Sequence, residues 1–201
     1  MKIVFATNNE HKLAEARRIA GGEFTILSLS DIGCHADLPE TQPTIEGNSL
    51  QKAAYVKEHF GYDCFSDDTG LFVDALQGAP GVFSARYAGP ECSPDQNITK
   101  LLAEMQGIDN RDARFRTVVT LVSDRDLPGS SPHGNLHAIQ FEGAVEGSIA
   151  TERSGNGGFG YDPIFIAKEN GISFADLLPE EKNAISHRGR ALRKLFDYLK
   201  K

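Results

Sequence analysis

The sequence is poor in cysteine and contains no long hydrophobic run. Its three cysteines, Cys34, Cys64 and Cys92, form an odd set without C-x-x-C spacing, which supports neither a disulfide framework nor a structural zinc site. No stretch approaches the ~20 consecutive apolar residues of a transmembrane helix, and the N-terminal segment becomes polar too early for a signal-peptide core. We therefore expect a soluble, cytoplasmic protein with reduced thiols that does not act at a membrane.

An excess of basic residues is also absent. Lysine and arginine number 21 against 28 aspartates and glutamates, for a net charge of −7, and this balance argues against nucleic acid as the main partner. Two catalytic motifs are missing as well: the G-x-x-x-x-G-K-[ST] loop of Walker-type nucleotide hydrolases and the G-x-S-x-G elbow of serine hydrolases. A small polyanion bound by a local basic cluster is compatible with this composition.

What is present is the composition of an ordinary globular protein. The chain has 201 residues, of which 40% are hydrophobic and 24% charged, and no linker, repeat or low-complexity tract divides it, so we expect one α/β domain over residues 1–201. Apolar spacing predicts strands at 2–6, 24–29, 64–66, 71–73, 115–121, 136–141, 144–149 and 164–166, and helices at 13–20, 45–59, 93–106 and 188–199. These elements do not alternate cleanly, which favours a mixed sheet with flanking helices.

The first polar segment of interest runs from Thr7 to Lys12, where the first strand meets the first helix. Free backbone N–H groups and the helix dipole attract phosphate at such a place, and Lys12 can neutralise its charge. The simpler interpretation is that Asn8 or Asn9 caps the helix and that the lysine is solvated. Taken alone, the segment favours the simpler interpretation.

The second segment contains two adjacent carboxylates, Asp67 and Asp68, between two short apolar runs. We expect an acidic turn joining two strands. Carboxylate oxygens suit Mg²⁺, which usually takes one or two of them and completes its shell with water and substrate phosphates. A carboxylate there can also act as a general base. The structural alternative is a solvated Asx turn.

The third region lies near the C-terminus. Residues 155–160 match G-x-G-x-x-G but precede a strand rather than a helix, which excludes a dinucleotide-binding fold. What remains is a glycine loop ending in Phe159 and Tyr161, suited either to closing over a flat ring or to a tight turn with core aromatics. At the start of the last helix, Lys182, His187 and Arg188 can donate to a carbonyl-bearing base or serve as cap and surface charges.

Five ordered motifs together resemble one family. They are T-N-N-E-H-K at 7–12, S-D-D-T-G-L at 66–71, G-A-P-G-V-F-S-A-R-Y at 78–87, G-F-G-Y-D-P-I-F at 158–165 and S-H-R-G at 186–189. The set is similar to the inosine triphosphate pyrophosphatase family, the HAM1-like non-canonical purine nucleoside triphosphate pyrophosphatases, and spans almost the whole chain. The resemblance implies an elongated mixed β-sheet with flanking helices that form two lobes around a central cleft, and a homodimer that uses Mg²⁺.

The resemblance also implies site residues. The catalytic proton acceptor falls on Asp68, which would orient or deprotonate a water for attack on the α-phosphorus, and Mg²⁺ ligands fall on Glu40, Asp67 and Asp68. Substrate-binding positions fall on Thr7, Asn8, Asn9, Lys12, Lys52, Thr69, Arg86, Phe159, Gly160, Tyr161, Asp162, Lys182, His187 and Arg188. Asn8 stands where the family often has glycine. The products would be a nucleoside monophosphate and pyrophosphate, so the enzyme would remove ITP, dITP, XTP and dXTP from the nucleotide pool.

Two other functions fit parts of the pattern. A Maf-type nucleotide pyrophosphatase would act on different bases, and Phe159–Asp162 together with Ser186–Arg188 favour the inosine-type pocket over it. A non-catalytic nucleotide sensor would keep the pocket and lose turnover, and the carboxylates at positions 40, 67 and 68 argue against it.

Overall fold

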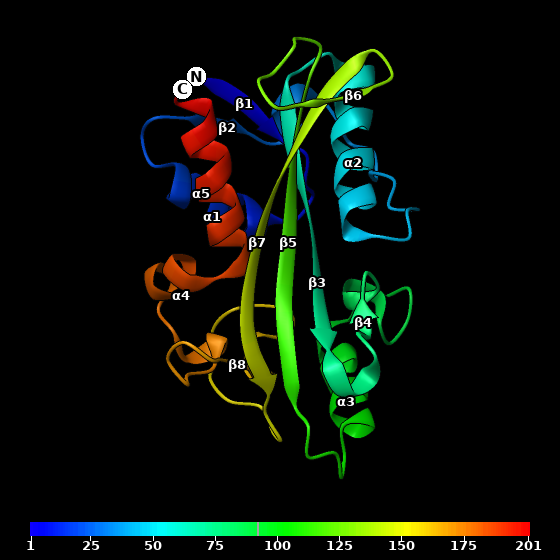
Figure 1. Cartoon of the computed structure of the whole chain (residues 1–201), viewed down its shortest axis with the longest axis vertical. Coiled ribbons are helices and arrows are strands. Elements are labelled where there is room, and N and C mark those ends of the chain that lie inside the picture. The colour runs from blue at the N-terminus through cyan, green and yellow to red at the C-terminus, as the bar shows by residue number, and fades with distance from the viewer. Residues whose placement is uncertain (92) are drawn as a thin grey trace. The chain divides into compact units, whose positions relative to one another are not determined.

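A computed structural model describes residues 1–91 and 93–201, so Cys92 lies outside the described residues (Figure 1). The strands are β1 (Lys2–Phe5), β2 (Thr25–Leu27), β3 (Cys64–Val73), β4 (Pro80–Gly81), β5 (Asp112–Ser123), β6 (Ser131–His133), β7 (Leu136–Ile149) and β8 (Phe165–Ala167). The α-helices are α1 (Glu10–Ala20), α2 (Ile45–Phe60), α3 (Pro94–Glu104), α4 (Pro179–Ile185) and α5 (His187–Leu199).

Within the described residues, one eight-stranded sheet has the order β2-β1-β3-β5-β7-β6, with β4 on β3 and β8 on β7. β1 pairs in parallel with β2 and β3, whereas β4, β6 and β8 pair antiparallel with their neighbours. The sheet is therefore mixed, as the sequence predicts. The chain divides into two compact units: Met1–Asp68, Thr117–Gly143 and Arg188–Lys201 form unit 1, and Thr69–Arg116 and Ala144–His187 form unit 2.

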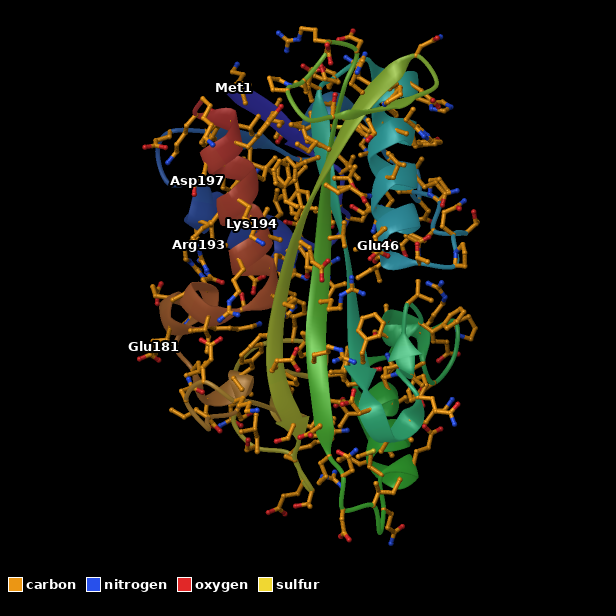
Figure 2. The ribbon with its side chains drawn as sticks, in the orientation of Figure 1. Met1, Glu46, Glu181, Arg193, Lys194 and Asp197 are labelled. Atoms are coloured by element: carbon orange, nitrogen blue, oxygen red, sulfur yellow. The ribbon has the colours of Figure 1, made fainter. Side chains whose placement is uncertain are left out.

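In unit 1 the strands are covered on both faces. Ile3, Phe5 and Phe65 pack with residues of α1 and α5 in one core cluster, whereas Val4 and Cys64 pack with α2 in another. This division follows from the strand period, because successive side chains point to opposite faces. Figure 1 shows α5 and α2 on either side of these strands, and Lys194 of α5, labelled in Figure 2, donates to the carbonyl of Glu142 on β7 at 2.7 Å.

The core of unit 2 is aromatic. Phe115, Phe165 and Phe174 contact one another with ring centroids 4.6–6.2 Å apart, and residues of β3, β5, β7 and α3 complete the cluster. The glycine-rich stretch after β3 contains the two-residue strand β4. Cys34 and Cys64 are buried free thiols. Among the described helices, none combines the length and hydropathy needed to cross a membrane.

Three element predictions were wrong. The expected acidic turn is the middle of a single ten-residue strand, β3, and the two strands expected from 136 to 149 are the single strand β7. Aspartate and glycine normally disfavour strands, but β-propensity yields to tertiary context, here cationic partners for the aspartates. Lys182 does not open the last helix: it lies on α4, which Ser186 separates from α5 with an extended backbone (φ −67°, ψ 154°).

Candidate active site

The turn after β1 is built as a helix cap. The side chain of Asn9 accepts from the backbone N–H of Lys12 at 3.1 Å, and the hydroxyl of Thr7 accepts from the N–H of Asn9 at 3.2 Å. Asn8 is exposed and donates to the carbonyl of Ala36 at 3.4 Å. The cap predicted from sequence is therefore present and is made by Asn9. It fixes Lys12 in the first turn of α1, where the helix dipole favours an anion.

Asp67 lies on β3 between two cations. Its Oδ1 is 3.0 Å from the Nζ of Lys12 on α1, and its Oδ2 is 3.0 Å from the Nε of Arg188 on α5. Arg188 also pairs through Nη1 with Glu15 of α1 at 2.6 Å. Asp67 is 1% exposed and Arg188 3%. A buried carboxylate needs such charge-assisted hydrogen bonds to offset its desolvation.

Asp68, one residue on, points to the other face of β3, toward α2. Its Oδ2 accepts from the side-chain amide of Asn48 at 3.2 Å, and its Oδ1 lies 3.7 Å from the Nζ of Lys52. The same ammonium group is 2.5 Å from Glu40. Glu40 and Asp68 thus flank one lysine. Because Asn48 and Lys52 are four residues apart on α2, they lie on one helical face and reach β3 together.

The two aspartates have different proton affinities. Burial alone would raise the pKa of Asp67, but the charges of Lys12 and Arg188 outweigh it and hold that pKa well below the ordinary value. Burial dominates at Asp68, whose pKa is raised despite Lys52. Neighbouring carboxylates whose environments move their pKa values apart are a common sign of divided roles. Asp67 is suited to remain a fixed anion, and Asp68 to accept a proton.

A second set of predicted residues meets in unit 2. The carboxylate of Asp162 accepts from the Nζ of Lys182 at 2.6 Å and from the backbone N–H of Phe159 at 2.7 Å. The ammonium of Lys182 also lies 4.5 Å from the centroid of the Phe159 ring. A side chain on Gly158 would place its Cβ 2.2 Å from Asp162 at a φ of +73°. Glycine is therefore required for this loop to approach the carboxylate so closely.

Tyr161 and His187 are packed into the core of unit 2. The Tyr161 hydroxyl donates to the carbonyl of Ser84 at 2.8 Å, which corresponds to the core-aromatic interpretation of the glycine loop. The imidazole of His187 stacks on Phe115 with centroids 4.5 Å apart. Of the remaining predicted residues of this unit, Gly160 and Thr69 are half-buried, and the guanidinium of Arg86 lies over the exposed ring of Phe83 at 5.2 Å.

The predicted residues thus fall into two sets. Thr7, Asn8, Asn9, Lys12, Glu40, Lys52, Asp67, Asp68 and Arg188 belong to unit 1, and Thr69, Arg86, Phe159, Gly160, Tyr161, Asp162, Lys182 and His187 belong to unit 2. Sequence reasoning missed Glu15 and Asn48. Their spacing could have identified both from the sequence. Glu15 follows Lys12 by three residues and Asn48 precedes Lys52 by four, so each lies on the same helical face as a predicted site lysine.

The carboxylates of unit 1 differ in their fit to a divalent cation. Across the part of the chain that the structure describes, no three His, Cys, Asp or Glu side chains group closely enough to hold a metal by themselves. Mg²⁺ does not need such a cage, since it is often bound by one or two carboxylates plus substrate phosphates. Glu40 and Asp68 fit this role, because they already share one cation, the ammonium of Lys52. Asp67 fits less well, because Lys12 and Arg188 engage both its oxygens.

Comparisons with known proteins agree with one another. The Ham1 family model matches residues 3–198. A protein named dITP/XTP pyrophosphatase from Flavobacterium johnsoniae is 48% identical, with 99% of this chain and 98% of that protein covered, and one of the same name from Porphyromonas gingivalis is 49% identical, with 98% and 97% covered.

Solved structures show the same relationship. The structure of a HAM1 protein from Coxiella burnetii superposes with a TM-score of 0.85 at 36% identity, covering 100% of this chain and 98% of that one. The Staphylococcus aureus Ham1 protein gives a TM-score of 0.84 at 34% identity, with the same coverage. The mixed α/β fold predicted from the sequence is thereby confirmed.

Proposed function

Since the chain belongs to the Ham1 family, we propose that it is a nucleoside triphosphate pyrophosphatase that hydrolyses the non-canonical purine nucleotides dITP, ITP, XTP and dXTP to the monophosphate and pyrophosphate. The relatives named dITP/XTP pyrophosphatase support this activity over nearly the full length of the chain. The observation that carries the proposal is the arrangement on β3, where Asp67 lies between Lys12 and Arg188 and Asp68 lies between Asn48 and Lys52.

In the proposed reaction Asp68 accepts a proton from the attacking water. A carboxylate whose pKa is raised by burial is a stronger base than an exposed one. Asn48 orients this carboxylate through its amide, and Lys52 offers an ammonium group to the phosphates. Lys12, in the first turn of α1, supplies a second positive charge. Net-acidic proteins bind polyanions only where such cations gather locally.

We also propose that the enzyme uses Mg²⁺. Glu40 and Asp68, the two carboxylates that flank the ammonium group of Lys52, would hold it. When bound, the ion would neutralise phosphate charge and stabilise the pyrophosphate leaving group.

For the base, we propose that residues of unit 2 contribute. Phe159 offers an aromatic face, and its position is fixed by the hydrogen bond from its N–H to Asp162. Hypoxanthine and xanthine present a 6-oxo acceptor where adenine presents an amino donor. Of the donors predicted from the sequence, Lys182 and His187 lie in unit 2 and would pair with the 6-oxo group but not with the amino group. Sites built on such hydrogen bonds reject unmatched analogues by ~10⁴-fold or more.

The test of the proposed function is substrate profiling. Purified protein is incubated with ITP, dITP, XTP, GTP, ATP and dTTP, with and without Mg²⁺, and pyrophosphate and orthophosphate are measured separately. We expect Mg²⁺-dependent pyrophosphate release with ITP and XTP well ahead of ATP. Preference for dTTP would indicate a Maf-type specificity, binding without turnover would indicate a sensor, and orthophosphate release would contradict cleavage between the α- and β-phosphates. The same preparation tests the expected homodimer by sedimentation.

A further inference from the structure

Four charged side chains in unit 1 form a chain of alternating sign that begins and ends on α1. Lys12 pairs with Asp67 of β3, Asp67 with Arg188 of α5, and Arg188 with Glu15 of α1, at N···O distances of 3.0, 3.0 and 2.6 Å. Lys12 and Glu15 are three residues apart, so they are neighbours on the helix surface. These four residues, here called the ionic ring, join one helix to a strand and to a second helix.

The ionic ring is buried enough to be rigid. The side chain of Glu15 is 12% exposed and that of Lys12 16%, and Arg188 and Asp67 are nearly inaccessible. Removing one charge would leave its buried partner with fewer charge-assisted hydrogen bonds, which is costly, so each member holds the next in place. Arginine suits the central position because its planar fork can donate in two directions at once.

Resting on the proposed function, in which Lys12 binds substrate phosphate, we propose that Glu15 and Asp67 are positioning residues that act through the ionic ring to hold the Lys12 ammonium in its phosphate-binding place. Asp67 then serves as a counter-anion for Lys12 and Arg188 rather than as a metal ligand. Arg188, whatever its contact with the base, also supports phosphate binding. Glu15 is linked to Lys12 through Arg188 and Asp67, so a change at Glu15 tests whether these ion pairs transmit the effect.

The experiment measures binding of inorganic pyrophosphate by calorimetry in the presence of EDTA, so that neither a base nor a metal contributes. Glu15→Gln removes a negative charge near an anion site, and simple electrostatics would therefore tighten binding. Positioning predicts the opposite sign: about tenfold weaker binding, since small misplacements of a binding group can cost up to ~10²-fold. The matched control is Glu23→Gln, which removes the exposed Glu23–Lys200 pair (2.7 Å) of the same unit and should leave the affinity unchanged.

A double-mutant cycle identifies the route of the effect. If Glu15 acts through Lys12, Glu15→Gln should have little effect in a Lys12→Ala background, whereas independent contributions would add. Three results would each overturn the inference. The effects of the two substitutions could be additive, Glu15→Gln could bind pyrophosphate as tightly as the wild type or more tightly, or Lys12→Ala alone could leave the affinity unchanged. Should Glu15→Gln fail to fold, Arg188→Lys tests the same link, because lysine keeps the charge without the fork. Failure of the proposed function is distinct: the wild type would bind pyrophosphate but release none from ITP.

Discussion

Asp67 and Asp68 share a sequence environment, but the strand gives them different partners. Alternation on β3 turns Asp67 toward Lys12 and Arg188 and Asp68 toward Asn48 and Lys52. Two chemically identical side chains on adjacent residues thereby acquire opposite pKa shifts. For these two residues, the face of the strand on which the side chain lies determines the pKa shift, because it determines the charged partners.

Asp68→Asn keeps the shape of the side chain and removes both the proposed base and the charge of a proposed Mg²⁺ ligand. We expect kcat for ITP, measured at saturating Mg²⁺, to fall by ~10²–10⁴ because general-base assistance is lost. Asp74→Asn is the control: this aspartate is exposed, pairs with Arg114 at 3.2 Å, and should leave kcat within about twofold. Near wild-type turnover in Asp68→Asn would remove Asp68 from catalysis.

Two features of the secondary structure position the site residues of unit 1: where a helix begins, and which face of a helix or strand a residue lies on. α1 begins at a cap that the sequence predicts, and Asn48 and Lys52 lie on one face of α2. β3 is the element that sequence patterning misjudged, because its central polar residues are satisfied by side chains distant in the sequence. A helix cap can be predicted from neighbouring residues in the sequence, whereas the distant partners of polar residues in a buried strand cannot.

The cap of α1 can be tested by stability. Asn9→Ala removes the side-chain acceptor for the N–H of Lys12 and should lower the free energy of unfolding by about 1 kcal/mol, whereas Asn9→Ser should restore most of it. Urea unfolding followed by circular dichroism measures both. Asn8→Ala, at the exposed neighbouring position, is the control and should change stability by less than ~0.5 kcal/mol. Equal stability of the alanine and serine variants would contradict the capping role.

Across the whole molecule, charge contributes to stability as well as to the site. Lys57, at the end of α2, lies 2.8 Å from Asp63 and 3.2 Å from Asp124, and Arg125 pairs with Asp63 at 2.5 Å. Partial burial works against ionisation of Asp63, but hydrogen bonds from Lys57 and Arg125 outweigh it and lower its pKa. This cluster ties together the segments that follow α2 and β5.

Asp63 should therefore stabilise the fold at neutral pH and not in acid. Because its folded pKa lies below the ordinary 3.8, its contribution is present above that value and disappears as the pH falls through the folded pKa. We expect Asp63→Asn to cost about 1.5 kcal/mol at pH 7, the lower end of the range for hydrogen bonds to charged groups, because Asp63 is partly exposed. The difference from wild type should shrink below pH ~3.8, as measured by urea unfolding across pH 3–7. A pH-independent difference would show that charge is not responsible.

The sequence by itself determined the mixed α/β fold, most element positions and the family, because hydrophobic period, caps and ordered motifs are local properties of the chain. It also placed Asp68 and Lys12 among the candidates. Only the tertiary structure decided that Asp67 and Asp68 face opposite ways on one continuous strand. It also decided that Glu15 pairs with Arg188 and that Asn48 donates to Asp68. The physical reason is that a buried charge depends on its partners, and here the partners come from helices up to 173 positions away in the sequence.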